Sequence, residues 1–546
     1  ISGCGLSTMT SKYDTANFTV TPPIMQVHAG NVTLNIDGNF TEKYFAKRAT
    51  VSFTPVIVYD GGETAFKTIT IQGEEAEGGE ATVFYESGGG FSYQDAIPYN
   101  DAMLNSKLEL RAIGTLKSPT SLMQDEEKSF PNIFLADGTI ATSQRVQNVE
   151  EIAVSNHGYE KETILSETAT IYFLVNQSSI RTTEKSDEDI QRIKDFAKQG
   201  NKTHSVEIKS YASPEGSIDV NDNVSDRRME STVKYTKWLM KKVGLDDAKN
   251  NNLYVENSFG EDWEGFNRLM RVSDIKDKRR ITKIVNSVED LEKREQEIRD
   301  MAELYEAIEK DVLPQLRKAQ ITVRTFESKR TENEISSLAI NNPIELDIKE
   351  LLYAATLTND REMKENIFIS AAEIHKDWRG YNNIGCLYLS EGNLIEASNY
   401  FSKAEDLGGN QNDINVNKGI IASWKGELLE AEKLFEKGNA SEYNQAILNI
   451  RKGDYKKAAR FFKGKNSHNA ALSQILNGNN NVNCTDNTAA CYYLNAIVGA
   501  RKSNESLLIN NLKKAVEIDS SYKLEALNDL EFIHYRQNEI FQSIIK

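Results

Sequence analysis

Hydrophobic and polar residues alternate in short runs from about Phe18 to Lys117. The runs at 32–36, 49–53, 56–59 and 68–71 are rich in β-branched residues, and glycine clusters at 61–62 and 88–90 separate them. A period of two residues is typical of a strand with one buried face, and the glycine clusters indicate turns. The pattern predicts an all-β sandwich over residues 18–143, with no motif that indicates chemistry.

Strands and helices alternate between residues 167 and 326. A hydrophobic strand over 169–175 is followed by a helix over about 186–199, a strand over 205–212 and a helix that opens near 221 and reaches about 241. The last strand is expected over 321–326, after a charged helical insertion at about 267–312 that we predict to be an exposed helix pair. A strand-rich connector over 144–166 and a linker over 327–346 flank this α+β domain.

A long repeat organises the last third of the chain, from about residue 347 to 546. Gly419 lies 34 residues after Gly385. Phe435 lies the same 34 residues after Phe401. This interval, with small and aromatic residues at fixed offsets, is the pattern of tetratricopeptide repeats, and it predicts a C-terminal α-helical solenoid. The expected core residues, which include a third, shortened copy, are Tyr381, Gly385, Tyr388, Ala397, Phe401, Gly419, Ala431, Phe435, Ala458 and Phe462.

Polar residues at a fixed spacing mark the α+β domain. After the turn at 213–216 come Asn221, Ser225 and Arg228. Their order and spacing resemble the OmpA-like peptidoglycan-associated domain, in which a turn Thr-Asp-x-x-Gly precedes Asn-x-x-Leu-Ser-x-x-Arg-Ala. The resemblance implies that Arg228 binds the carboxylate of diaminopimelate in the wall's peptide stem, while an aspartate binds its ammonium.

The aspartate position of that motif holds Ser213 in this chain. A hydroxyl group does not balance an ammonium charge, so we expect peptidoglycan binding to be weak or absent. Glu215 replaces the aspartate only if the turn at Pro214 bends it inward, and Arg228 is alternatively a surface arginine paired with carboxylates such as Asp226. The candidate wall-binding residues are Arg228, Asn221, Ser213 and Glu215.

The sequence begins Ile1-Ser2-Gly3-Cys4, which resembles the lipobox of a Bacteroidetes lipoprotein. The resemblance implies a lipid on Cys4, a polar tether up to residue 17 and a place on the periplasmic side of the outer membrane. Asp14-Thr15-Ala16 resembles the O-glycosylation site of that phylum, with the glycan on Thr15.

Charge and composition limit the chemistry. A net charge of -16 argues against nucleic acid as a partner. The 6 histidines and 4 cysteines lack metal-ligand spacing, so we expect no metal, no cofactor and no catalytic residue. Cys484 and Cys491 are close enough in sequence to form a disulfide, but buried thiols are the interpretation that we favour for them and for Cys386.

These features indicate a non-enzymatic, lipid-anchored scaffold between the outer membrane, the cell wall and partner proteins. The expected partner is an outer-membrane β-barrel or lipoprotein, bound in a concave groove of the repeats. The alternative is an accessory subunit of an outer-membrane complex, for β-barrel assembly, type IX secretion or nutrient uptake, that does not bind peptidoglycan. A wall-processing enzyme is a third, weaker interpretation.

Overall fold

The computed structural model describes residues 5–118, 124–215, 217–245, 248–300, 302–408 and 411–546. The chain forms two compact units. One unit comprises Ile1–Asn156 together with Thr358–Lys546, and the other comprises His157–Leu357.

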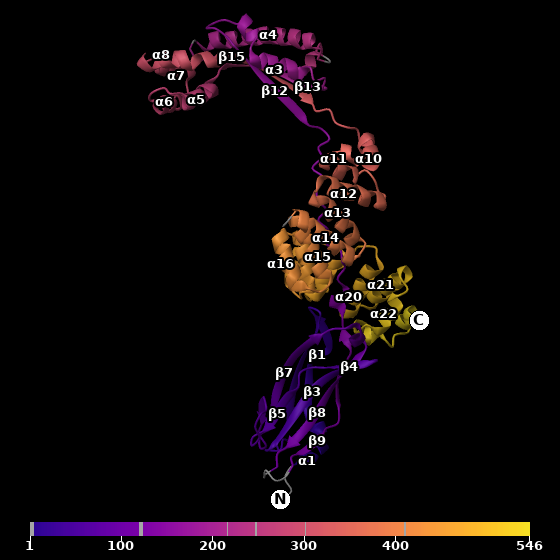
Figure 1. The fold of residues 1–546 in the computed structure, drawn as a ribbon. Coiled ribbons are helices and arrows are strands. Elements are labelled where there is room, and N and C mark those ends of the chain that lie inside the picture. The colour runs from indigo at the N-terminus through magenta and orange to yellow at the C-terminus, as the bar shows by residue number, and fades with distance from the viewer. Residues whose placement is uncertain (1–4, 119–123, 216, 246–247, 301, 409–410) are drawn as a thin grey trace. The chain divides into compact units, whose positions relative to one another are not determined.

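The first unit opens with two β-sheets, drawn in indigo and violet in Figure 1. One sheet has the order β11-β1-β2-β7, formed by β1 (Asn17–His28), β2 (Asn31–Phe40), β7 (Gly89–Pro98) and β11 (Thr139–Ile140). The other has the order β10-β8-β3-β5-β6, with β4 on β3 and β9 on β8. Its strands are β3 (Ala49–Tyr59), β4 (Gly62–Ala65), β5 (Ile69–Gly73), β6 (Ala81–Val83), β8 (Ser106–Leu116), β9 (Glu126–Ser129) and β10 (Ile133–Asp137). The predicted β-rich N-terminal region is confirmed.

Both sheets contribute side chains to one hydrophobic core. Alternate residues of β2 are buried, as the period-two pattern predicts. The ring of Phe91 lies so close to Gly38 that an added Cβ would be 2.4 Å from it, so the strand needs glycine at this position. Phe53 stacks on Phe91 with ring centroids 5.4 Å apart. Aromatic packing therefore joins the two sheets.

The residues before the first strand differ from the expected tether. Leu6–Ser11 form helix α1, and Tyr13–Thr15 form a 3-10 helix. Leu6 and Met9 are buried in the core of the two sheets. Three apolar side chains, those of Leu6, Met9 and Tyr13, were too few to show a helical period in a short polar stretch.

The C-terminal part of this unit is a series of packed helices, coloured from orange to yellow in Figure 1. They are α12 (Arg361–His375), α13 (Trp378–Ser390), α14 (Leu394–Gly408), α15 (Asn412–Trp424), α16 (Leu428–Gly438), α17 (Glu442–Arg451), α18 (Tyr455–Phe461), α19 (His468–Leu476), α20 (Ala489–Arg501), α21 (Glu505–Ile518), α22 (Tyr522–Asn528) and α23 (Glu539–Ile545). Helix α13 packs on α14 and α15 packs on α16, so the 34-residue period corresponds to a helix pair. The predicted tetratricopeptide-like helical region is confirmed.

The expected repeat-core residues are placed where close packing requires them. An added Cβ on Gly385 would lie 2.5 Å from the ring of Phe401, and one on Gly419 would lie 2.5 Å from Phe435. Ala397, Phe401, Ala404, Ala431, Phe435, Ala458 and Phe462 are buried, whereas Tyr381 and Tyr388 are half-buried. Small residues thus let paired helices approach until the aromatic rings fill the space between them.

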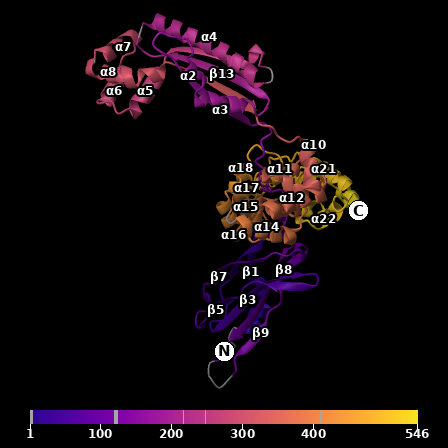
Figure 2. The same ribbon diagram turned by 45° about the horizontal axis from the view of Figure 1, so that its top comes forward.

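The second unit is built on the sheet β12-β15-β13-β14. Its strands are β12 (Ile164–Tyr172), β13 (Thr203–Ala212), β14 (Tyr254–Glu261) and β15 (Lys318–Phe326). Strand β13 is parallel to β14, and β15 is antiparallel to both β12 and β13. Helices α3 (Glu188–Ala197) and α4 (Ile218–Val243) share one hydrophobic core with the sheet, and Figure 2 shows them beside β13.

The remaining elements of this unit correct two expectations. The insertion is not an exposed helix pair, because its described residues form five helices. Of these, α5 (Trp263–Val272), α6 (Lys278–Ser287), α8 (Ala302–Asp311) and α9 (Leu313–Leu316) contribute to a hydrophobic cluster that includes Phe266 and Ile281, and α7 (Leu291–Arg299) packs beside α6. The expected linker over 327–346 contains helix α10 (Glu332–Asn341). Helix α11 (Ile348–Ala354), expected to open the repeats, belongs to this unit, as does the short α2 (Thr182–Lys185).

The strand-rich connector expected over 144–166 is also different. Residues 146–163 are fully described, and none of them lies in a strand or helix. Strand β12 begins only at Ile164. Asparagine side chains bind the backbone of this extended segment at Gln147, Glu151, Ala153 and Ser155.

We predict that Phe401→Ala lowers the free energy of unfolding of the helical array by about 3–5 kcal/mol, because it leaves a cavity between α13 and α14. Ile395 is the matched control, because its side chain is 74% exposed on the same helix, and Ile395→Ala should change stability by less than about 0.5 kcal/mol. Denaturant unfolding followed by helical circular dichroism measures both. Equal effects of the two substitutions would contradict the packing described here.

Candidate functional site

Four helices of the array hold an extended segment of the same chain, residues 146–156, which we call the strap. One asparagine from each helix donates its amide N–H to the carbonyl oxygen of a strap residue and accepts the N–H of that same residue. The pairs are Asn469 of α19 with Gln147, Asn444 of α17 with Glu151, Asn417 of α15 with Ala153 and Asn383 of α13 with Ser155, at 2.7–3.1 Å. We call these four side chains the asparagine ladder.

The ladder explains why the strap is extended without being part of a sheet. An asparagine amide has an acceptor oxygen and a donor nitrogen, so it can satisfy both backbone groups of one residue, as a neighbouring strand would. Glu151, Ala153 and Ser155 alternate along the strap, and alternate residues of an extended chain face the same side. The ladder therefore contacts the backbone and leaves the choice of side chain largely open.

The side chain of Glu150 is fully buried, at 0% exposure. Its carboxylate lies 3.5 Å from the guanidinium of Arg451 and accepts the Trp424 indole N–H at 2.7 Å. Burial lowers the pKa of Arg451, although the carboxylate opposes that shift. Loss of one partner of a buried pair typically costs about 3–5 kcal/mol, so Glu150 and Arg451 fix the strap along the groove.

Ser155 and Ala153 make further contacts with the helices. The Ser155 hydroxyl donates to Asp413 at 2.7 Å and accepts from the amide of Asn382 at 3.0 Å. The Cys386 thiol donates to the carbonyl oxygen of Ala153 at 3.4 Å. Burial raises the pKa of this thiol, so it stays protonated and can donate. Cys386 is thus a buried thiol, as predicted.

The strap begins at a docking point between the β-sheets and the C-terminal helices. The Arg145 guanidinium pairs with Glu525 at 2.8 Å and with Asp529 at 3.1 Å. It also lies over the ring of Tyr493, 4.2 Å from the centroid. These contacts fix the first strap residue, Val146, against the hydrophobic core of the last helices.

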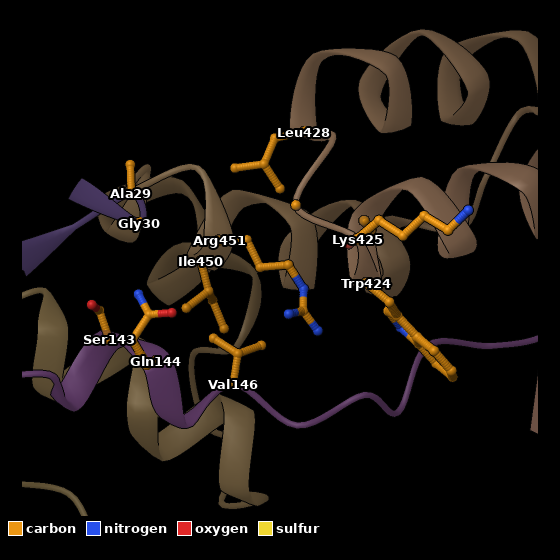
Figure 3. Close-up of a pocket in the computed structure, with 12 residues that line it drawn as sticks. Ala29, Gly30, Ser143, Gln144, Val146, Trp424, Lys425, Leu428, Ile450 and Arg451 are labelled. Carbon is orange, nitrogen blue, oxygen red and sulfur yellow. The ribbon is translucent and has the colours of Figure 1, made fainter. Parts of the chain in front are cut away.

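A cavity of about 400 Å³ opens beside the strap. Figure 3 shows Ile450 above Val146, with Ala29 and Gly30 at the left of the view and Trp424 and Lys425 at the right. Because Arg451 lines the cavity and also pairs with Glu150, the cavity gives solvent access to one side of the occupied groove.

A fifth asparagine repeats the ladder contact at a loop. Asn495 of α20 accepts the N–H of Cys484 at 2.8 Å and donates to its carbonyl oxygen at 2.9 Å. Cys484 and Cys491 form a disulfide, so the prediction that they are free thiols is wrong. Asp486 lies near both sulfur atoms, but a disulfide sulfur is not a thiolate ligand, so this group does not indicate a metal site.

The groove thus corrects the expectation of an open concave surface, because the chain's own strap fills it. Sequence reasoning missed the ladder, although one signal was present: Asn417 lies 34 residues after Asn383, which is the repeat period. Asn444 and Asn469 fall out of that period because the later repeats are shorter.

In the other unit, Arg228 is 1% exposed within helix α4. Its guanidinium donates to the carbonyl oxygens of Leu174, Gln177 and Tyr211 at 2.9–3.2 Å. Burial and the neighbouring Arg317 lower the pKa of Arg228 to about 10. The alternative of a surface arginine paired with Asp226 is therefore wrong. The guanidinium is committed to backbone carbonyl groups rather than aimed at a ligand.

The turn before α4 does bend Glu215 inward. Its carboxylate accepts two bonds from the Arg317 guanidinium, at 2.7 and 2.8 Å, and one from the Ser213 hydroxyl at 2.6 Å. Arg317 comes from the residues just before β15, and sequence spacing gave no sign of it. Asn221 donates to Glu261 at 2.8 Å. The motif residues thus lie close together, but Arg317 already neutralises the carboxylate of Glu215, which would replace the aspartate.

The two predicted modification sites, Thr15 and Cys4, are untested by the structure. Thr15 is exposed at the end of its 3-10 helix, with its hydroxyl donating to the carbonyl oxygen of Lys12 at 2.7 Å, and its glycosylation stays a prediction. Cys4 lies outside the described residues. Its lipidation also stays a prediction.

We predict that the strap protects the Cys386 thiol from alkylation. In the folded chain, iodoacetamide should modify Cys386 at least about tenfold more slowly than in Ala153→Pro, because proline has no N–H for Asn417 and loosens the strap above the thiol. The control is Val255→Ala, because Val255 is exposed and lies outside the strap. Mass spectrometry of the Cys386 peptide measures the rate; rapid labelling of the unchanged chain would contradict an occupied groove.

The chain is similar to several solved structures. No protein-family model matches the chain, and no curated protein matches it. A tetratricopeptide repeat protein from Parabacteroides merdae is similar at 16% identity over 39% of this chain and 91% of its own, with a TM-score of 0.28. The PilF protein of Pseudomonas aeruginosa is similar at 12% identity over 39% of this chain and 98% of its own, with a TM-score of 0.25.

Proposed function

We propose that this protein is a non-enzymatic adaptor of the bacterial outer membrane, an accessory subunit that holds extended segments of polypeptide in its helical array. The observation that carries the proposal is the asparagine ladder, which holds the backbone of an extended segment at four successive helices. Repeat arrays present extended concave binding surfaces, and hydrogen bonds to the main chain give affinity for an extended peptide.

The second unit supports an OmpA-like origin. In its sheet the last strand lies between the first and the second, and two helices share one hydrophobic core with the sheet. This arrangement agrees with the order of strands and helices on which the resemblance is based. Asn221, Ser225 and Arg228 are all buried at the start of the helix that follows the motif's turn. We therefore keep the OmpA-like assignment as part of the proposal.

Within this proposal, we favour the accessory subunit over the wall anchor. A wall-binding arginine must present its guanidinium to the ligand's carboxylate, and Arg228 instead donates to three backbone carbonyl groups. Glu215, the only candidate for the missing aspartate, is paired with Arg317. Recruiting either charge to a ligand would break bonds that the protein already makes.

The proposal places the chain on the periplasmic side of the outer membrane through a lipid on Cys4. No helix in the described part of the chain is long and apolar enough to cross a bilayer. A lipid anchor would attach the protein without any apolar protein surface. Replacing Cys4 with alanine in cells should move the protein out of the outer-membrane fraction, and unchanged fractionation would contradict the anchor.

The adaptor role is tested by recovery of partners. A C-terminally tagged chain, extracted in mild detergent, should bring down outer-membrane β-barrel proteins or lipoproteins in stoichiometric amounts. Recovery of wall fragments alone would favour the anchor, and a cleared band in a peptidoglycan zymogram would contradict a non-enzymatic role.

We predict that the full chain does not sediment with purified peptidoglycan at micromolar concentration. Ser213→Asp should not create strong binding, because the new carboxylate would face Arg317, which already pairs with Glu215. The matched control is Ser217→Asp, which lies beside the same turn but outside this cluster. Binding by the unchanged chain that is lost on Arg228→Lys, with the fold intact by circular dichroism, would reverse the preference for an accessory subunit.

A further inference from the structure

The strap occupies the groove as a bound peptide would, although it belongs to the same chain. It has no hydrophobic core of its own, and its Val154 side chain is 61% exposed. The side chains of Glu151 and Asn156 are exposed as well. Val146, Ile152 and Ala153 pack against the hydrophobic clusters of the helices. The rest of its hold on the groove comes from hydrogen bonds to its backbone and from the side chains of Glu150 and Ser155.

The hydrogen bonds of the ladder do not depend on which chain supplies the backbone. Each one replaces a bond to water and contributes about 0.5–1.5 kcal/mol net. The covalent link at Val146 adds a high local concentration, typically millimolar for a short tether, which favours the strap over a free competitor. A segment of another protein could make the same ladder contacts once that advantage is overcome.

The side-chain contacts define which segments fit. The Arg451 guanidinium and the Trp424 indole N–H require an acidic residue at the position of Glu150. Two further positions favour a small residue above the Cys386 thiol, as at Ala153, and a hydroxyl that donates to Asp413, as at Ser155. The pattern is an acidic residue, a small residue three positions later and a serine or threonine two positions after that.

We propose that the strap is an exchangeable internal ligand, and that the asparagine ladder takes in its place an extended partner segment with this acidic, small and hydroxyl pattern. This proposal rests on the adaptor function and names the kind of partner segment. The strap would then act as a competitor that keeps the groove closed to segments that lack the pattern. The Arg145 contacts lie outside the exchanged residues and keep the start of the strap in place.

The test uses the full chain with a double substitution in the strap, Glu150→Lys and Ser155→Asp. The new lysine faces Arg451 and the new carboxylate faces Asp413, so both side chains are repelled while every groove residue is unchanged. The probe is a fluorescent peptide with the sequence of residues 147–156. We expect the variant to bind this peptide at least about tenfold more tightly than the unchanged chain, by fluorescence anisotropy, because more of its groove is free.

Two controls make the result specific. Adding Asn417→Ala and Asn444→Ala to the strap variant should reverse the gain, because the peptide then loses two ladder contacts. A peptide that carries the same lysine and aspartate should bind neither protein. Both results support recognition by the ladder and by the groove residues that contact positions 150 and 155 of the strap.

The alkylation rate of Cys386 shows whether the strap has left the groove. If the thiol becomes reactive but the peptide binds no more tightly, the groove does not accept a segment in trans and the proposal is overturned. If neither the double variant nor Ala153→Pro exposes the thiol, the strap is not exchangeable and the proposal is overturned as well. Peptide binding without recovery of any envelope partner would instead count against the adaptor function, and would leave the exchange supported.

Discussion

The bidentate hydrogen bond between an asparagine side chain and the backbone of a strap residue is the interaction on which the first unit depends. A buried backbone N–H or C=O group without a partner is costly, so an extended segment can lie inside a helical groove only if side chains satisfy both groups. Asn383, Asn417, Asn444 and Asn469 do so at four points. Without them, residues 146–156 would have to stay in water or join a sheet.

This constraint connects the parts of the unit. Arg145 and Val146 attach the end of the β-sheets to the last helices, and the strap then runs past the helices in reverse order, from α19 to α13. The helical array thus binds a segment of its own chain with the chemistry that it would need for a partner. In the second unit, too, the charged groups bind the protein itself. Arg228 donates to backbone carbonyl groups and Glu215 pairs with Arg317, so neither charge is presented to a ligand.

Local and periodic signals allowed much of the fold to be predicted. The alternation around Val32–Ile36 indicated a half-buried strand, and the offset from Gly385 to Gly419 indicated packed helix pairs, because each reflects contacts within one element or one repeat. Helix α1 was missed because only long-range packing of Leu6 and Met9 stabilises it. The strap was missed because its partners lie between 228 and 322 residues away. At the candidate wall site, spacing found Ser213, Glu215 and Arg228, but Arg317 is 104 residues from Ser213, and only the folded sheet brings them together.

The central claim, that the chain's own strap fills the groove, is tested most directly by hydrogen exchange at the strap's amide groups. The account predicts that the N–H groups of Glu151, Ala153 and Ser155 exchange at least about 100-fold more slowly than in an unstructured peptide, since each opening must break ladder contacts. Replacing Asn444, Asn417 or Asn383 with alanine should release the N–H group that each one binds, and affect the other two less. Exchange of all three amide groups at the rate of an unstructured chain in the unchanged protein would contradict the account.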